Sequence, residues 1–272
     1  MARIVVFNQK GGVGKTTTTL NLAGLLARRG RDPLVIDLDP QGHTSFIAGL
    51  QPSADQSVYG FFRDVRRLAD VTYRSSLGWD VIPAHLDLAK VDSQYGKGPN
   101  VLNKLKAGLI RERLAPERPV LIDACPMLGT LSLNGIFAAD RVLVPVSADY
   151  LAVKGVEQVD RTLRALEHVV KARIPRRYVV TRFDRRRKLS WQIVEQLRER
   201  HGDDVCQTAI SENVSLAESP AHNRDVFGHA PDSKGAGDYR DLLDELIESG
   251  FIPLGFTPRV IAGAVPASIL AR

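Results

Sequence analysis

Eight consecutive residues near the start of the chain have the types and spacing of a phosphate-binding loop. They follow the apolar run 4–7 and are Lys10, Gly11, Gly12, Val13, Gly14, Lys15, Thr16 and Thr17. The three glycines allow backbone conformations in which successive N–H groups surround a phosphate. Lys15 adds a positive charge, and the Thr16 hydroxyl suits Mg²⁺. The spacing therefore predicts a nucleotide site, although a chance glycine-rich turn would share part of the pattern.

The residues around this loop indicate a strand before it and a helix after it. The run 4–7 predicts a buried strand, and leucines and alanines recur with helical spacing over 17–29, where Gly30 ends the pattern. A helix that begins at the loop directs the positive end of its dipole at the phosphates. A phosphate-binding loop requires this order of strand, glycine loop and helix.

Short apolar runs alternate with helical patterns along the rest of the chain. Strands are predicted over 4–7, 34–38, 79–83, 120–123, 142–146, 178–181 and 205–207, and further helices over 101–114, 156–171, 189–200 and 239–248. The alternation predicts an α/β fold with a single doubly wound, mostly parallel sheet of the P-loop NTPase type, flanked by helices. In such sheets ligands bind at the carboxyl ends of strands, where Gly11, Asp39 and Asp123 all fall.

Asp123 ends the apolar run 120–122, and we expect it to be buried there. A lone buried carboxylate needs a counter-charge, for which Mg²⁺ held through water is the natural candidate. Asp37 and Asp39 stand at the end of another apolar run. A helix cap or a turn is the structural alternative for each of the three aspartates.

Length and composition favour one enzyme domain rather than several modules. The chain has 272 residues, of which 44% are hydrophobic and 25% charged, enough to bury a large core. No apolar run approaches the ~18 residues that cross a bilayer, and the start has no signal-peptide pattern, so we expect a cytoplasmic protein. Cys125 and Cys206 are too few for a disulfide framework and form no C-x-x-C metal pair.

A second lysine in the loop resembles a feature of a known family. Lys10 stands five residues before Lys15 and resembles the signature lysine of the deviant Walker A ATPases, the ParA/MinD family. Residues 35–43 resemble switch I of ParA-type proteins, and residues 120–126 resemble their Walker B and switch II. Three later stretches are also similar to that family: 132–146, 215–220 and 233–239. The resemblance covers residues 2–249, and the chain is identified as a member of the ParA/Soj-type partitioning ATPases.

The resemblance implies an Mg²⁺-dependent ATPase that binds ATP and forms a homodimer with it. In the family the residue matching Lys10 reaches across the dimer to the partner's nucleotide, and the residue matching Asp39 orients or activates the attacking water. The implied catalytic residues are Lys10, Lys15 and Asp39. The implied metal residues are Thr16, Asp37 and Asp123. A solvated surface lysine is the alternative for Lys10 considered alone.

Nine basic residues and a single acid lie between residues 171 and 188. This window has a net charge of +8 and the whole chain +6, so the remainder has −2. Such a concentration is typical of sequence-independent binding to DNA phosphates, with a solvated basic face as the alternative. The resemblance favours nucleoid DNA. The predicted DNA contacts are Arg182, Arg185, Arg186, Arg187 and Lys188.

The chain departs from the family over 210–215, which reads Ile-Ser-Glu-Asn-Val-Ser. Many chromosomal ParA relatives have a basic I-P-R-N-V-R-like run here, so DNA contact must rely on the 182–188 segment. The same loop often frames the adenine in the family. The residues implied for the adenine pocket are Ser211 and Asn213, and Arg182 is a further residue implied for nucleotide binding.

Residues 1–250 are predicted to form the ATPase domain and 251–272 an apolar tail that contains three prolines. We expect the tail to pack on the domain, to bind a partner or to be partly disordered. It allows a second interpretation, a MinD-like ATPase that cycles on a membrane, but prolines interrupt the helix that such an anchor needs. A third interpretation, an iron–sulfur reductase of the nitrogenase Fe-protein type, needs two suitably placed cysteines, and Cys206 lacks that context.

The resemblance also implies partners. ParA-type ATPases segregate chromosomes or plasmids or position other large cargo, and a ParB-like protein or cargo adaptor stimulates their hydrolysis. The sequence does not identify the cargo or that adaptor.

Overall fold

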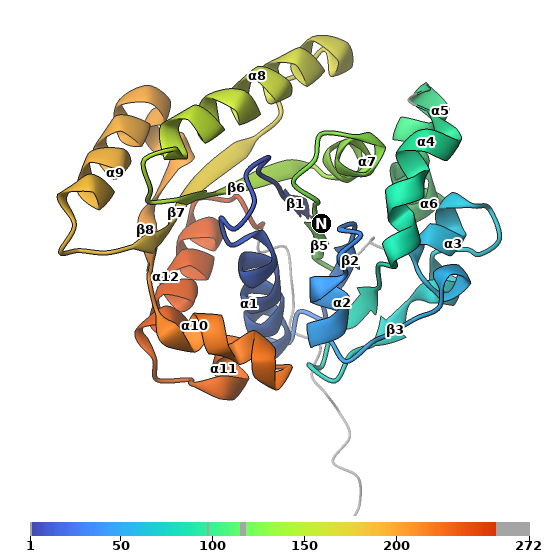
Figure 1. Ribbon diagram of the computed structural model, residues 1–272, viewed down its shortest axis with the longest axis horizontal. Coiled ribbons are helices and arrows are strands. Elements are labelled where there is room, and N and C mark those ends of the chain that lie inside the picture. The colour runs from blue at the N-terminus through green and yellow to red at the C-terminus, as the bar shows by residue number, and fades with distance from the viewer. Residues whose placement is uncertain (1, 97, 115–117, 254–272) are drawn as a thin grey trace, which may run out of the picture.

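A single eight-stranded sheet forms the centre of the molecule (Figure 1). In the computed structural model, which describes residues 2–96, 98–114 and 118–253, the strand order is β3-β4-β2-β5-β1-β6-β7-β8. The strands are β1 (Arg3–Val6), β2 (Leu34–Asp37), β3 (Tyr73–Arg74), β4 (Asp80–Ile82), β5 (Val120–Asp123), β6 (Arg141–Ser147), β7 (Arg176–Phe183) and β8 (Val205–Ser211). Every neighbouring pair is parallel except β3 with β4. The predicted doubly wound, mostly parallel α/β sheet is confirmed.

Helices cover both faces of this sheet, with α1 and α12 on one face and α7 and α8 on the other (Figure 1). The helices are α1 (Lys15–Arg28), α2 (His43–Ile47), α3 (Val58–Phe62), α4 (Val91–Tyr95), α5 (Pro99–Leu102), α6 (Lys104–Arg111), α7 (Thr130–Ala138), α8 (Ala152–Val170), α9 (Lys188–His201), α10 (Val214–Glu218), α11 (Val226–His229) and α12 (Lys234–Glu248). None of the helices among the described residues is both long and apolar enough to cross a bilayer.

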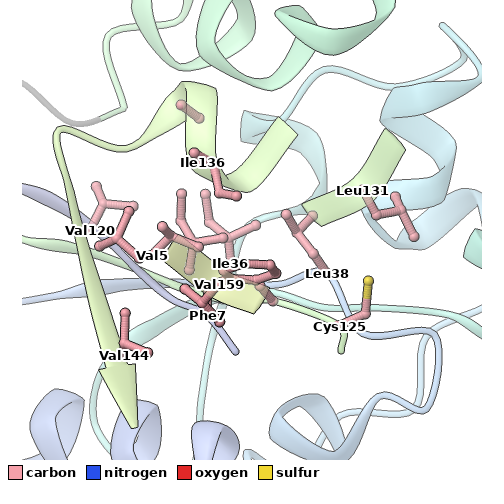
Figure 2. Packing of buried hydrophobic residues seen from close by; sticks show 14 of the residues in the cluster. Val5, Phe7, Ile36, Leu38, Val120, Cys125, Leu131, Ile136, Val144 and Val159 are labelled. Carbon is pink, nitrogen blue, oxygen red and sulfur yellow. The ribbon is translucent and has the colours of Figure 1, made fainter. Parts of the chain in front are cut away.

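Alternate residues of the central strand β1 enter two separate hydrophobic cores. Ile4 and Val6 pack in the core that contains α1 and α12, whereas Val5 and the following Phe7 pack in the core that contains α7 and α8 (Figure 2). All four side chains are fully buried, as expected for a parallel strand with a helical layer on each face. This burial on both faces fixes the position of the strand, and with it the position of the loop that follows.

The carboxyl ends of β1, β2 and β5 lie side by side at one edge of the sheet. Asp123 is in register with Asp37 of β2 on one side and with Val6 of β1 on the other. Because β6 lies on the other side of β1, the strand order reverses there, and ligands of doubly wound sheets bind at that point. The fold therefore brings the glycine loop and both aspartates to one place.

The structure contains elements that the sequence pattern does not predict. The edge strand β3 has only two residues, too few to show an apolar alternation. The helix expected over 101–114 is divided into α5 and α6 at Asn103. The short helices α2, α3, α4, α10 and α11 have four or five residues each, which is too short for a helical period to appear.

Two residues beyond α12 pack against the domain. Phe251 and Ile252 are buried in the core that contains α1 and α12. Residues 254–272 of the predicted tail lie outside the described residues. The domain boundary at residue 250 and the role of the tail therefore stay predictions.

Candidate active site

The loop between β1 and α1 has the conformation that phosphate binding needs. Gly12 and Gly14 have φ angles of 71° and 87°, in the left-handed region that disfavours residues with a Cβ atom. Gly14 is the N-cap of α1. The N–H groups of the loop and the positive end of the helix dipole therefore share one location, which favours an anion.

Two buried side chains from neighbouring elements hold this loop in place. The Asn8 carboxamide accepts the Lys10 N–H at 2.9 Å and donates to the Pro145 carbonyl at 2.8 Å. The Thr181 hydroxyl, on β7, donates to the Val13 carbonyl at 2.9 Å. These contacts connect the loop to β6 and β7.

Lys15, the first residue of α1, is buried beside the loop. Its ammonium group donates to the Lys10 carbonyl at 3.0 Å, and only 7% of the residue is exposed. Burial lowers the pKa of Lys15, and the neighbouring Asp123 and Asp39 carboxylates oppose that shift. A buried cation over a glycine loop is suited to phosphate oxygens, which is the role that the sequence predicts for it.

Asp123 is bound by two hydroxyl groups. Thr16 and Thr44 both donate to its Oδ2 atom, at 2.8 and 2.7 Å. Its Oδ1 atom is buried and has no hydrogen-bond partner among the described residues. Burial raises the pKa of Asp123, and the two threonine hydrogen bonds oppose that shift. Because an unpartnered buried carboxylate oxygen is costly, this oxygen marks the place of a cation or of its water.

The atoms at this point suit Mg²⁺. This ion prefers oxygen ligands and keeps several of its own water molecules. Thr16 and Asp123 present only oxygen atoms, and one of these lacks a partner. Within the described ranges, no three His, Cys, Asp or Glu side chains gather to hold a metal. The ion would therefore complete its shell with water and nucleotide oxygens.

Asp37, the third residue implied for the metal, forms hydrogen bonds within the chain. Its Oδ2 atom accepts the Ser45 N–H at 2.9 Å and the Ser45 hydroxyl at 2.6 Å, and its Oδ1 atom accepts the Asp39 N–H at 3.1 Å. Burial raises the pKa of Asp37, and the charge of Asp123 adds to the effect. These bonds tie the end of β2 to α2. A contact between Asp37 and Mg²⁺ stays a prediction.

Asp39 lies in the loop after β2 and is partly exposed. Its Oδ1 atom accepts the Gln41 N–H at 3.0 Å, and no described residue donates to its Oδ2 atom. Its charge influences the pKa of both Lys15 and Asp123, so the carboxylate lies close to the phosphate loop. One oxygen of Asp39 is thus available to a water molecule at that place.

Lys10 extends from the lip of the loop toward the residues that follow β6. Its ammonium group lies 2.5 and 2.6 Å from the two carboxylate oxygens of Asp149, and 3.5 Å from the Ser147 hydroxyl. The Ser147 hydroxyl donates to the same carboxylate at 2.5 Å. Lys10 and Lys15 therefore extend to different sites, although both belong to one loop.

A cavity of about 250 Å³ lies beside the first turn of α1. Its lining includes the residues that the sequence implies for the nucleotide: Thr17, Arg182, Ser211 and Asn213. Leu216 and Tyr239 add apolar surface. The Asn213 Oδ1 atom is buried and has no hydrogen-bond partner among the described residues. A cavity that combines apolar surface with an unused acceptor fits a flat heterocycle that carries hydrogen-bond donors.

The basic window 171–188 does not form one patch, and this part of the prediction is wrong. Its first four basic residues lie at or before the amino end of β7, where Arg173 pairs with Asp204 at 2.6 Å and Arg176 pairs with Glu167. Its other five lie at or beyond the opposite end, about 20 Å away along the strand. These five are exposed residues of one segment: Arg182, Arg185, Arg186, Arg187 and Lys188. The five predicted DNA contacts thus lie together, but the other four basic residues of the window do not add their charge to this segment.

Three site residues were not singled out by the sequence motifs: Thr44, Ser45 and Asp149. Two of them follow the aspartate pair of switch I within a few positions, at the start of α2. Asp149 lies two residues after the end of β6, just as Asp39 lies two residues after the end of β2. The rule that ligands bind at the carboxyl ends of strands would identify it.

The two cysteines lie in different cores. Cys125 packs in the core with α7 and α8, and Cys206 in the core with α1 and α12. Burial raises the pKa of each thiol to about 12. Two protonated thiols on opposite faces of the sheet do not form the thiolate pair that an iron–sulfur cluster needs.

The chain is similar to characterised proteins over most of its length. The AAA domain family matches residues 1–175. The chromosome-partitioning ATPase Soj of Thermus thermophilus is 39% identical over 248 residues, which are 90% of this chain and 95% of that protein. The sporulation initiation inhibitor protein Soj of Bacillus subtilis is 33% identical over 91% of this chain and 98% of its own.

A solved structure is also similar. Cobyrinic acid a,c-diamide synthase from Mycobacterium smegmatis, crystallised with a bound ATP analog and magnesium, has a TM-score of 0.77 and 29% identity, over 90% of this chain and 93% of that chain. Together with the glycine loop, the second lysine and the aspartates at the strand ends, these similarities establish that the chain belongs to the ParA/Soj-type partitioning ATPases of the AAA domain family.

Proposed function

We propose that the chain is a ParA-type ATPase switch that binds ATP with Mg²⁺, forms a sandwich dimer, binds DNA without sequence preference and positions or segregates a cargo. The observation that carries the proposal is the pair of lysines in one loop. Lys15 is buried over the glycines, whereas Lys10 extends outward to Asp149. A single phosphate site needs only the first of them, so the second would exchange Asp149 for the nucleotide of another subunit.

ATP would bind with its phosphates in residues 10–17 and its adenine in the cavity beside Ser211 and Asn213. The ATP analog and magnesium bound to the 29%-identical relative support this assignment. Thr16 and Asp123 would hold the ion, which supplies positive charge to the phosphate oxygens as the terminal bond breaks. Lys15 adds charge to the same oxygens, and the glycine-loop N–H groups fix their position.

Hydrolysis requires a water molecule in line with the terminal phosphate. Asp39 has one carboxylate oxygen without a donor among the described residues, and that oxygen would accept a hydrogen bond from the water and orient it. Its other oxygen is held by the Gln41 N–H, which limits rotation of the carboxylate. Catalysis by positioning and charge is the rule for phosphoryl transfer.

We expect Lys10→Ala to bind ATP as a monomer and to lose the ATP-dependent dimer. The Lys10 side chain contacts Asp149 and Ser147, not the glycine loop, so its removal leaves the phosphate site of its own subunit intact. Light scattering with ATP and Mg²⁺ measures the mass directly. Lys106→Ala, on the exposed side of α6, is the control and should dimerise. A Lys10→Ala chain that forms a normal dimer would exclude contact with the partner's nucleotide.

DNA binding is assigned to the exposed segment Arg182–Lys188 at the carboxyl end of β7. Dimerisation would double the number of cations presented to one duplex. Because phosphate contacts release counterions, the logarithm of affinity should fall linearly with the logarithm of salt concentration, with a slope near −0.9 for each phosphate neutralised.

Changing Arg185, Arg186 and Arg187 to Glu should remove DNA binding and leave ATP binding and dimerisation intact, because these residues lie outside the nucleotide cavity. Filter binding across a salt series measures the first effect, and calorimetry the second. The matched control changes Lys106, Arg111 and Arg113, exposed on and after α6, to Glu. Unchanged affinity and salt slope in the first variant would mean that the segment is a solvated basic face.

The proposed location is the cytoplasm, on the nucleoid, with a ParB-like protein or cargo adaptor that stimulates hydrolysis and so releases the DNA. Binding to DNA–cellulose and to anionic liposomes, each with ATP and then ADP, tests this against the MinD-like alternative. Retention on DNA with ATP supports the proposal, and retention on liposomes alone would overturn it.

A further inference from the structure

One of the two tryptophans of the chain is half exposed beside the basic segment. Trp191 lies in the first turn of α9 and is 53% exposed, whereas Trp79 is fully buried. The face of α9 that packs in the core is formed by Ile193, Val194 and Leu197. The Trp191 indole is therefore not needed to fill that core.

Two contacts fix the orientation of this indole. Its Nε1–H donates to the Arg185 carbonyl at 3.0 Å. Its ring lies edge-on to Phe183, with centroids 5.0 Å apart and planes at 82°. The indole thus joins the first turn of α9 to the start of the basic turn, and its exposed surface is held in place rather than free to rotate.

The turn before α9 is braced by a carboxylate. Asp184 accepts the Arg186 N–H and the Arg186 Nε–H, both at 3.0 Å, and lies 3.3 Å from the Arg187 guanidinium. The hydrogen bonds from Arg186 lower the pKa of Asp184 to about 2. The carboxylate therefore stays charged at physiological pH and ties the turn to the side chains of Arg186 and Arg187.

Two cations beside the indole lack a counter-charge. Arg185, whose carbonyl accepts the indole N–H, and Lys188, three residues before Trp191 on α9, form no ion pair with any of the described residues, unlike Arg186 and Arg187. A preformed turn thus presents unneutralised positive charge next to a fixed aromatic surface. Unpaired nucleotides supply the complementary partner, because each carries a phosphate charge and a flat base.

We propose that Trp191 is a base-stacking residue and that this face binds single-stranded DNA in addition to duplex. The inference rests on the proposed DNA binding of the same segment and adds the chemical form of the ligand. In a duplex the base faces are covered by their neighbours, so an indole contributes little there. In a single strand it stacks on one base, while the surrounding cations contact the backbone.

An anionic membrane is the other partner that basic and aromatic residues attract. Membrane-binding helices carry a long apolar face beside the basic one. Here the apolar face of α9 is buried in the core, and the exposed apolar surface at its start consists of Trp191 and the 39%-exposed Leu189. That surface suits one base better than a bilayer.

The test uses the full chain with ATP and Mg²⁺, oligothymidine of about 20 nucleotides, longer than one binding site of this type, and a duplex of equal length. Trp191→Leu should weaken single-strand binding about 5- to 150-fold, the range for loss of one stacked base. Trp191→Phe, which retains a ring, should restore most of the affinity. Duplex binding and the salt slope should change little in both variants, because no charge is lost.

Intrinsic fluorescence excited at the tryptophan edge gives a second measurement. Because Trp79 is buried, oligothymidine should quench the signal of Trp191, and Trp191→Phe should show no quenching. If Trp191→Leu loses affinity equally for single-stranded and for duplex DNA, the indole only stabilises the turn. That result would overturn the proposal.

A shift of the Trp191 fluorescence with phosphatidylglycerol vesicles but not with oligothymidine would mean that this face binds lipid instead of DNA, and would overturn the proposal. If the parent chain binds duplex but not oligothymidine, this inference fails while the proposed function stands. If it binds neither, both fail.

Discussion

Lys15→Ala should weaken ATP binding by about 30-fold or more, since removal of one partner of a buried charge pair costs ~2–5 kcal/mol. The reason lies in the position of the ammonium group, which is buried over the glycine loop and has only the Lys10 carbonyl as a hydrogen-bond partner among the described residues. The triphosphate would lose its main cation, while the glycine N–H groups remain. Titration calorimetry with ATP and Mg²⁺ measures the effect.

The variant should still fold. The loop is held by Asn8 and Thr181, neither of which contacts the Lys15 ammonium group. Lys106→Ala serves as the control for loss of one positive charge. ATP affinity equal to that of the parent would disprove the assignment of residues 10–17 to the phosphates.

Asp39→Ala should bind ATP and dimerise but hydrolyse ATP about 100- to 1,000-fold more slowly, the usual loss when one positioned catalytic contact is removed. The cause is the loss of the carboxylate that orients water, while the Lys15 and Asp123 contacts remain. Phosphate release with DNA and the stimulating partner present measures the rate. Asp232→Ala, which changes an exposed aspartate outside the nucleotide cavity, is the control.

Asp39→Asn separates two possible causes of that loss. The amide retains the size of the side chain and can still accept one hydrogen bond, but it has no charge. A rate between those of the parent and the alanine variant indicates that orientation of the water contributes. Turnover at the parental rate in Asp39→Ala would exclude Asp39 from catalysis.

The phosphate loop could be predicted from sequence because its function depends on local geometry. Gly12 and Gly14 adopt the left-handed conformations that glycine permits, and the buried strand and the helix around them have clear apolar periods. The parallel strands were predictable for a similar reason: with helices on both faces, they appear as continuous apolar runs. β3, at the edge and with one exposed residue of two, shows no such run.

Contacts between distant segments could not be predicted in the same way. Thr44 reaches Asp123 across 79 positions, and Lys10 reaches Asp149 across 139. Neither pair has a local pattern, because the sheet register rather than the spacing along the chain brings them together. The rule about strand ends points to Asp149 but does not give its partner.

The prediction of one basic patch over 171–188 failed for the opposite reason, because residues that are neighbours in sequence lie far apart in space. Each residue of a strand advances the chain by about 3.3 Å, so the eight residues of β7 carry its two ends far apart. Arg176 at one end is buried in an ion pair with Glu167, and the exposed Lys171 and Arg173 lie at that same end, away from the exposed segment at the other. Net charge over a window is therefore a poor guide to a surface when a strand crosses that window.

The central claim is that the nucleotide controls DNA binding through dimerisation. The most direct test measures the affinity of the full chain for a random-sequence duplex, across a salt series, with a non-hydrolysable ATP analog and with ADP. The account predicts tight, strongly salt-dependent binding with the analog, and weak binding with a shallower slope with ADP, because only the dimer presents two basic segments. Equal affinity and equal slope in the two nucleotide states would contradict it.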